Sequence, residues 1–145
     1  MRLLIGIIKI NTDLERIGDH GVNIAQSAMK LMNEPPLKPL IDIPRMAVET
    51  KRMLKESLDS LMTGDVEQAR SVCRNDDMID DLKNQIFREL LTYMLEDSRT
   101  ISRAMELILV SRNLERIADL ATNIAEETIY ISEAKVIKHR IDNVK

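Results

Sequence analysis

Residues 14–25 read LERIGDHGVNIA, and residues 114–125, one hundred positions later, read LERIADLATNIA. Eight of the twelve positions are identical, and the matches include polar as well as apolar residues. Any amphipathic helix needs an apolar stripe, so repeated Leu and Ile alone would mean little. A solvated face accepts many different polar residues, so the repeated Glu, Asp and Asn indicate one role performed twice.

The repeated polar residues form what we call the acidic ladder, present once in each copy. Its members lie at positions i, i+4 and i+8, which advance only about 40° per step around a helix and therefore share one face. The repeated Leu and Ile point to the core, so the ladder lies beside or opposite the buried stripe. The two ladders are Glu15, Asp19 and Asn23 in the first copy, and Glu115, Asp119 and Asn123 in the second.

Composition points to a helical protein of ordinary solubility. The chain has 145 residues, of which 44% are hydrophobic, 31% charged and only 2% aromatic. Aliphatic residues and strong helix formers dominate, and no segment alternates with period two, so we expect an all-α fold without a sheet. The net charge of −3 and the scarcity of rings argue against nucleic-acid binding. The single Cys73 fits a reducing compartment, and no apolar run approaches a membrane span.

Periodicity divides the chain into four expected helices. From Leu3 to Leu31 the apolar residues follow a four-three spacing, and a stiff connector with three prolines follows. A second helix is expected from about residue 44 to 62, a third from about 66 to 96, and a fourth from about 99 to beyond 131. Gly64 and Asp65 separate the second from the third, and Asp97-Ser98 separates the third from the fourth.

We therefore expect the last helix of a first bundle at 1–33, a Pro-rich connector at 34–41, a complete antiparallel three-helix bundle at 42–133 and a frayed basic tail at 134–145. The first helix corresponds to the fourth, because both carry the repeated motif. Its long apolar stripe must be covered, either by the second bundle or by another copy of the chain. We expect the second solution, a homo-oligomer.

A dense group of aspartates begins the third expected helix, within the segment NDDMIDD at residues 75–81. Asp76 and Asp80 are i, i+4 neighbours, and four like charges in six positions repel one another. Counted from the Asp97-Ser98 turn, Asp80 lies 17 residues back and Glu115 lies 17 residues on, so a helical hairpin brings the two acidic pairs level. Oxygen ligands at this density suit Mg, Ca, Mn or iron, and several carboxylates can bridge more than one ion.

Plainer roles stay open at this point. The ladders could be solvated faces that bind a basic partner without metal, and the aspartates could favour the dipole of the helix that they begin. His20 replaces Leu120 and is expected at the surface, whereas Cys73 is expected to be a small, partly buried residue. A carboxylate-bridged metal enzyme is a third reading. Against it, the chain has no Glu-x-x-His pair, no nucleophile with a base and no Gly-rich phosphate loop.

The two repeated motifs resemble the paired signature of the PhoU family of phosphate-uptake regulators. Residues 79–108, IDDLKNQIFRELLTYMLEDSRTISRAMELI, are also similar to the second repeat of that family. The resemblance implies a fold of two three-helix bundles with acidic motifs that hold multinuclear metal clusters. It implies metal-ligand roles for Asp76, Asp80, Glu115 and Asp119, with Asn123 nearby, and likewise for Glu15 and Asp19, with Asn23. The implied ions are iron, manganese, magnesium or zinc.

Two helices of the family pattern are missing before Met1, so we expect a truncated product, a shifted start or an expression fragment. The first metal site should then be half-built and the second complete. The resemblance also implies a cytoplasmic, non-enzymatic negative regulator of the phosphate-starvation response, peripheral to the membrane at most. Its implied partners are the ATPase subunit of the phosphate ABC transporter and a sensor histidine kinase, with no nucleic acid. The alternative is a metal-free helical protein–protein interaction module.

Overall fold

The computed structural model describes the backbone of residues 2–142 and the side chains of residues 3–134. Its elements are α1 (Arg2–Leu31), α2 (Asp42–Thr63), α3 (Val66–Arg74), α4 (Asp76–Glu96), the short 3₁₀ helix η1 (Ser98–Thr100) and α5 (Ile101–Asp142). No strand occurs among the described residues. The all-α prediction is confirmed.

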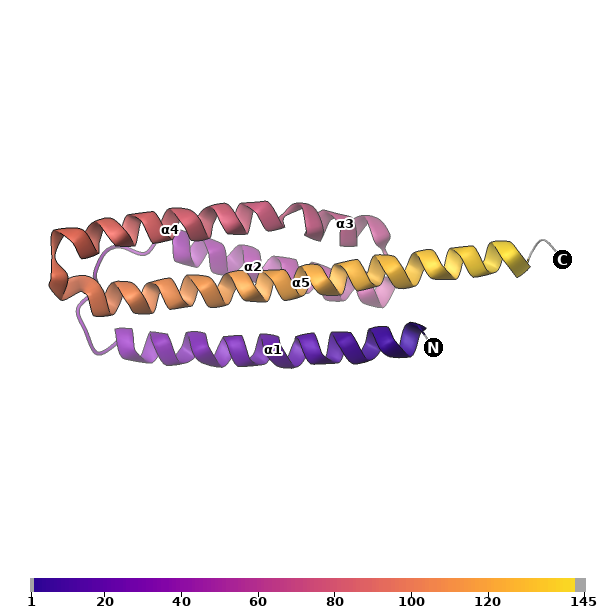
Figure 1. Ribbon diagram of the computed structural model, residues 1–145, viewed down its shortest axis with the longest axis horizontal. Coiled ribbons are helices and arrows are strands. Elements are labelled where there is room, and N and C mark those ends of the chain that lie inside the picture. Colours follow the sequence, from indigo (N-terminus) through magenta and orange to yellow (C-terminus); the bar gives the residue numbers. More distant parts are fainter. Residues whose placement is uncertain (1, 143–145) are drawn as a thin grey trace.

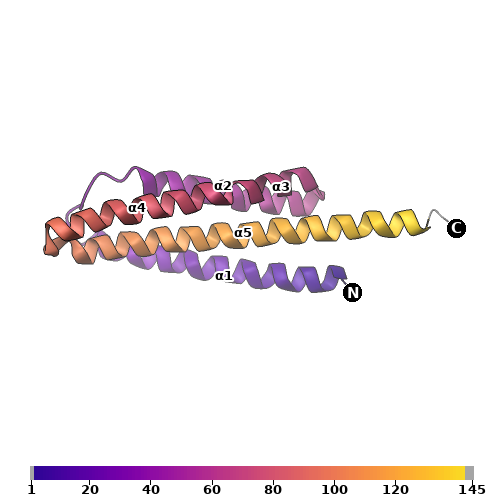
Figure 2. The ribbon, with the colours of Figure 1, turned by 45° about the horizontal axis from the view of Figure 1, so that its top comes forward.

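Helix α5 forms the axis of the molecule and contacts every other element. Figures 1 and 2 show α2, α3 and α4 on one side of α5, and α1 running antiparallel to α5 on the opposite side. The predicted antiparallel bundle preceded by a separate helix is therefore present. Within the chain, α1 covers part of its apolar stripe by packing on α5. The homo-oligomer stays a prediction.

The turn between α2 and α3 follows from two residues. Gly64 takes the left-handed conformation (φ 71°) that a side chain disfavours, and its N–H donates to Ser60 O at 2.8 Å, which closes α2. Asp65 then caps α3, because its side chain accepts a hydrogen bond from the backbone N–H of Gln68 at 3.0 Å. This confirms the stop and restart predicted at these positions.

The expected single helix over residues 66–96 is wrong, because a break at Asn75 divides it into α3 and α4. Asn75 lies near the bridge region (φ −84°, ψ −6°), and its N–H donates to Val72 O, three residues back. The break makes Asp76 and Asp77 the first turn of a new helix. There the unpaired N–H groups and the helix dipole stabilise negative charge, which relieves part of the repulsion among the aspartates.

The expected frayed tail at 134–145 is also wrong in part, since α5 continues to Asp142. No Gly or Pro follows Ile131, and the segment contains the helix formers Ala134, Lys135 and Lys138. Residues 143–145 lie outside the described residues. In Figure 1, α5 extends beyond the ends of α1 and α3.

The core lies where α5 meets α2, α3 and α4. Met46 and Met53 from α2, Ile79 and Leu90 from α4, and Ile124 from α5 are all within 1% of complete burial. By contrast, α1 leaves many large apolar side chains exposed: Leu3, Leu4, Ile5, Ile7, Ile8, Leu14, Val22 and Met29. Among the described residues, no helix is both long enough and apolar enough to cross a membrane.

Candidate functional site

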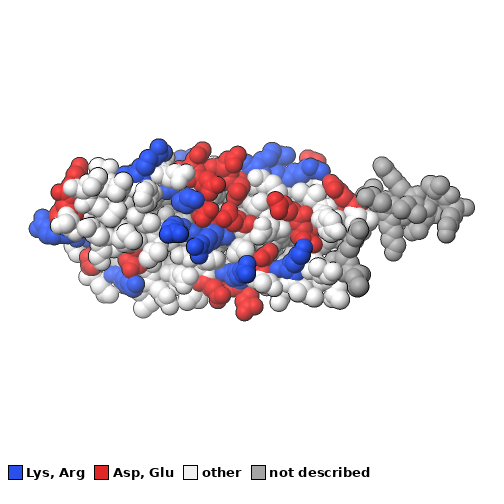
Figure 3. Space-filling model, viewed as in Figure 1, with Lys and Arg blue, Asp and Glu red and all other residues white. Residues whose placement is uncertain are grey.

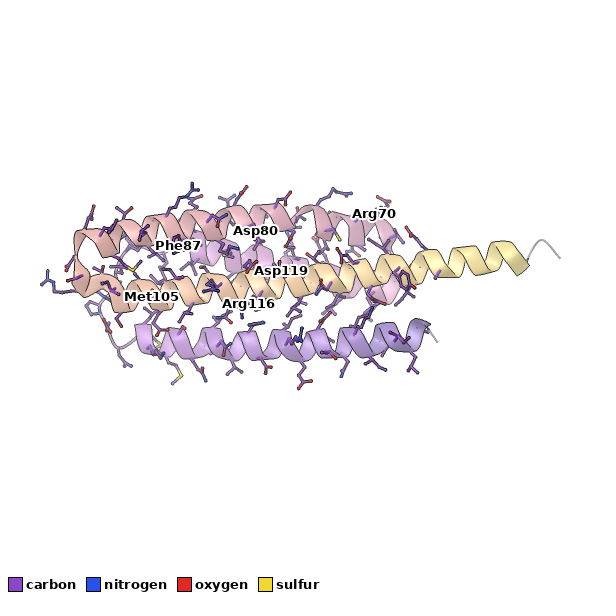
Figure 4. The ribbon with its side chains drawn as sticks, in the orientation of Figure 1. Arg70, Asp80, Phe87, Met105, Arg116 and Asp119 are labelled. Carbon is purple, nitrogen blue, oxygen red and sulfur yellow. The ribbon has the colours of Figure 1, made fainter. Side chains whose placement is uncertain are left out.

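Four carboxylates from two helices meet near the first turns of α4, at the end of the α4–α5 hairpin away from its connecting turn. Helix α4 contributes Asp76 and Asp80, and α5 contributes Glu115 and Asp119; we call these four residues the acidic cluster. Figure 4 shows Asp80 and Asp119 at the same level of the hairpin, and Figure 3 shows acidic side chains gathered in the middle of this face beside basic ones. The level arrangement predicted from the hairpin register is confirmed.

Lys83 supplies positive charge at one end of the acidic cluster. Its Nζ lies 3.4 Å from Asp80 Oδ1 on its own helix and 3.5 Å from Glu115 Oε1 on α5. Burial lowers the pKa of the Lys83 ammonium, but the charges of Glu115 and Asp80 outweigh that effect, so its pKa is raised. The lysine therefore stays charged and joins α4 to α5 through two ion pairs.

At the other end of the cluster, Asp76 and Asp119 hold their protons unusually tightly. Burial, the charge and hydrogen bond of Glu115, and the charges of Asp76 and Asp80 together raise the pKa of Asp119 to about 7. Burial likewise raises the pKa of Asp76, as do Asp80 and Glu115, whereas a hydrogen bond with Asp119 opposes the shift. The positive charge near these two carboxylates is too small to offset the repulsion from the neighbouring carboxylates.

A hollow of about 440 Å³ gives access to the cluster between α4 and α5. Its lining includes Lys83, Glu115 and Asp119, with Phe87 and Ile108 as apolar wall. A small ligand or ion can therefore reach the carboxylates from solvent.

A second hollow, of about 420 Å³, lies between α1 and α5, where the two repeated motifs cross. It is lined by residues one hundred positions apart: Arg16 with Arg116, Asp19 with Asp119, and His20 with Leu120. Equivalent residues of the two copies therefore border the same hollow, and Asp19 lines it together with Asp119 of the acidic cluster. In Figure 4, Arg116 lies on the side of α5 that faces α1.

The remaining predicted ligands are not brought to the acidic cluster. Glu15 is exposed on α1, and Asn23 donates a hydrogen bond to Asn113 Oδ1 at 3.3 Å. Asn123 lines a separate groove between α1 and α5. His20 is half-buried, lines the hollow between α1 and α5, and has its Nδ1 2.9 Å from Asn113 Oδ1.

The acidic cluster fits a metal ion by the chemistry of its donors. All four are carboxylates, which hard cations prefer, and two of them have raised pKa values that a cation would relieve. Over the part of the chain whose side chains are described, no three or more His, Cys, Asp or Glu side chains already stand close enough to hold an ion. An ion would therefore have to draw the carboxylates together.

Sequence reasoning missed Lys83, although a signal was present. Asp76, Asp80 and Lys83 lie at i, i+4 and i+7, which places them on one face of α4. The same register that made Asp80 level with Glu115 also places Lys83 within reach of Glu115. The position of Lys83 between Asp80 and Glu115 could therefore have been predicted.

Fold and site together define an all-helical repeat protein that carries one copy of its acidic motif on α1 and the other on the central helix α5. The PhoU domain model matches residues 1–28 and 43–128, and the chain belongs to the PhoU family. Its similarity to a PhoU homolog of the phosphate-specific transport system from Aquifex aeolicus is 48% identity, over 97% of this chain and 63% of that protein. A second homolog, from Thermotoga maritima, is 42% identical over 90% of this chain and 56% of its own length.

Solved structures agree with this assignment. The crystal structure of PhoU from Pseudomonas aeruginosa superposes with a TM-score of 0.88 at 39% identity, covering 92% of this chain and 64% of that one. The regulatory protein PhoU from Streptococcus pneumoniae superposes with a TM-score of 0.79 at 25% identity, covering 89% and 61%. The chain thus spans somewhat less than two thirds of the length of these relatives.

Proposed function

We propose that this chain is a metal-binding regulatory adaptor that represses phosphate uptake and the phosphate-starvation response. It acts in the cytoplasm, as a homo-oligomer and without catalysis, between the ATPase subunit of a phosphate ABC transporter and a sensor histidine kinase. The names of its relatives, accessory proteins of the phosphate-specific transport system, support the regulatory part of this proposal. The lack of a nucleophile–base pair and of a Gly-rich phosphate loop in the sequence supports the non-enzymatic part.

The observation that carries the metal-binding part is the meeting of Asp76 and Asp80 with Glu115 and Asp119. Four carboxylates on two packed helices raise the pKa values of Asp76 and Asp119, which means that the ionised cluster is under repulsion. A divalent or trivalent ion at this point would neutralise several charges at once, and an array of carboxylates can bridge more than one ion. Iron, manganese, magnesium and zinc are the candidates. The exposed Glu15 and Asp19 are weaker ligands on this view, since no helix equivalent to α4 faces them among the described residues.

A second candidate is a metal-free helical interaction module. The observation that favours it is the exposed apolar face of α1, together with the absence, over the described side chains, of a group already arranged to hold an ion. In that case the acidic residues would contact a basic partner surface directly. The two candidates differ in what weakens partner binding, because exposed charge pairs are screened by salt whereas a metal-dependent surface is abolished by a chelator.

The first test is the metal content of the purified chain, measured by inductively coupled plasma mass spectrometry. Wild type and the Glu115→Ala/Asp119→Ala variant are each incubated with iron, manganese and zinc and then desalted. Metal retained by wild type and lost by the variant would support the regulator. Absence of metal from both would leave the interaction module.

The second test is binding to the purified transporter ATPase subunit. Chelator and salt are titrated separately against the complex. Loss of binding in chelator at constant ionic strength favours the metal-binding regulator. Loss that follows ionic strength and ignores the chelator favours the metal-free module.

A further inference from the structure

The side chain of Lys83 lies between two of the four carboxylates of the acidic cluster. Its Nζ is shared between Asp80 at 3.4 Å and Glu115 at 3.5 Å, so a single ammonium bridges the two helices that supply the carboxylates. Glu115 is the more buried partner, with 18% of its side chain exposed against 46% for Asp80. The ammonium thus neutralises the carboxylate that water screens least.

Lys83 forms ion pairs with only two of the four carboxylates of the acidic cluster. Over the part of the chain whose side chains are described, no lysine, arginine or histidine nitrogen lies within ion-pair distance of Asp76 or Asp119. Those two carboxylates share a hydrogen bond. Lys83 therefore forms ion pairs with two of the four carboxylates, and the other two lie one helical turn away. Arg112 and Arg116 line the hollow between α4 and α5 without forming an ion pair with Asp76 or Asp119.

A metal ion and the ammonium cannot use the same oxygen atoms. Carboxylate oxygens bind Mg²⁺ or Ca²⁺ at about 2.0 to 2.6 Å, and Asp80 and Glu115 would have to turn toward the ion to reach that distance. The Lys83 side chain is 29% exposed, and its stem carries a compact charge on flexible single bonds. It can therefore move into solvent when another cation takes its place, at the cost of two ion pairs.

We propose that Lys83 is an internal counter-ion that competes with metal for Asp80 and Glu115, so that metal binds only as the ammonium leaves. The inference rests on the proposed metal site and assigns to that site a determinant of affinity that is not a ligand. In the metal-free chain the ammonium holds α4 to α5. A bound ion would supply the positive charge there instead, so occupancy of the site would depend on the concentration of free metal.

The test is a calorimetric titration of Mn²⁺ into the full chain, stripped with chelator, at neutral pH. The variants are Lys83→Met, which removes the charge and keeps the stem, and Lys83→Arg, which keeps the charge. Arg88→Met is the matched control, because it removes one positive charge from an exposed position of the same helix. We expect Lys83→Met to bind Mn²⁺ at least about tenfold more tightly than wild type, since one close charge competitor is gone. Lys83→Arg should stay within about threefold of wild type, and Arg88→Met should change the affinity by less than about twofold.

Each outcome decides either the inference or the site on which it rests. Mn²⁺ binding that is lost in Glu115→Gln/Asp119→Asn but unchanged by Lys83→Met would overturn the competition and leave the metal site standing. An absence of Mn²⁺ binding in wild type and Lys83→Met alike would overturn both. A second readout separates competition from a loss of structure: metal-free Lys83→Met should melt a few degrees below wild type, and Mn²⁺ should raise its melting temperature by more than it raises that of wild type. Lys83→Gln, which keeps a hydrogen-bond donor, replaces Lys83→Met if the latter fails to fold.

Discussion

The two copies of the repeated motif have nearly the same sequence and opposite surroundings. In the α5 copy, Leu114 is 7% exposed, because α2, α3 and α4 cover the helix; the equivalent Leu14 of α1 is 39% exposed. Ala118 and Ala121 of α5 are fully buried, whereas their counterparts Gly18 and Gly21 have open space around them. Two segments that share eight of twelve residues thus make a core helix at one place and a covering helix at the other.

The comparison indicates that the charge environment of an acidic ladder depends on the helix that packs opposite it. Glu115 and Asp119 face Asp76, Asp80 and Lys83 across the α4–α5 hairpin. Among the described residues, Glu15 and Asp19 face no such partner helix, and α1 contacts only α5. Asp19 instead opens onto the hollow where the two copies cross. Equivalent residues need not be equivalent sites.

The largest expected contrast is in core packing. Leu114→Ala should lower the free energy of unfolding by about 3 kcal/mol, because it empties space in a packed core. Leu14→Ala should cost less than about 1 kcal/mol, because water already reaches that side chain. Urea denaturation followed by circular dichroism measures both. Equal losses would mean that α1 is as well covered as α5, for instance by a second copy of the chain.

The next contrast concerns charge and pH. The folded chain raises the pKa of Asp119 to about 7 from an ordinary value of 3.8, so the folded state binds this proton more tightly than the unfolded state does. The protonated Asp119 therefore contributes its full stabilisation of the folded state at pH values below its pKa in the unfolded chain. This contribution is lost as the pH rises through about 7. In the absence of metal, Asp119→Asn should stabilise the chain above that range. We expect about 1 kcal/mol, well below the full value for the shift, because the carboxyl is partly solvated.

Asp19→Asn is the matched control, since Asp19 is exposed on α1. Thermal melts of both variants in chelator, from about pH 4 to about pH 8, give the comparison. Asp119→Asn should equal wild type at the acid end and exceed it at the alkaline end, whereas Asp19→Asn should follow wild type throughout. A gain at alkaline pH that is the same in both variants would argue against a special environment for Asp119.

The smallest contrast is at the glycines. Gly18→Ala and Gly21→Ala convert α1 toward the α5 sequence, and a Cβ at either position meets no atom within 4 Å. Each should stabilise the chain by about 0.5 to 1 kcal/mol, because glycine within a helix loses more backbone entropy on folding than alanine does. Chemical denaturation tests this. Destabilisation by either variant would indicate that something packs closely on that face in solution.

Much of this fold could be predicted from the sequence because its signals are local. The apolar spacing of α1, the glycine and aspartate at 64–65, and the Asp97-Ser98 turn each act on neighbouring residues, and the structure places helix boundaries at these points. The hairpin register followed from counting residues on either side of that turn, and it brought Asp76 and Asp80 level with Glu115 and Asp119. Apolar periodicity and residue counting were sufficient to predict these features because helical geometry is regular.

The other features depend on tertiary contacts, which the spacing of residues in the sequence does not show. The break at Asn75 could not be read from the sequence, because no residue there is a strong helix breaker. The position of Lys83 depends on which of several flexible charges reaches two carboxylates at once. His20 is half-buried because Asn113 of α5 offers it a hydrogen bond, which sequence spacing could not indicate.

We propose that the α5 copy of the ladder binds metal and that the α1 copy does not do so by itself. Electron paramagnetic resonance counts bound Mn²⁺ per chain in wild type, Glu115→Gln/Asp119→Asn and Glu15→Gln/Asp19→Asn at equal protein concentration. We expect the variant in α5 to lose the bound Mn²⁺ and the variant in α1 to keep it. Loss in the α1 variant with retention in the α5 variant would contradict it.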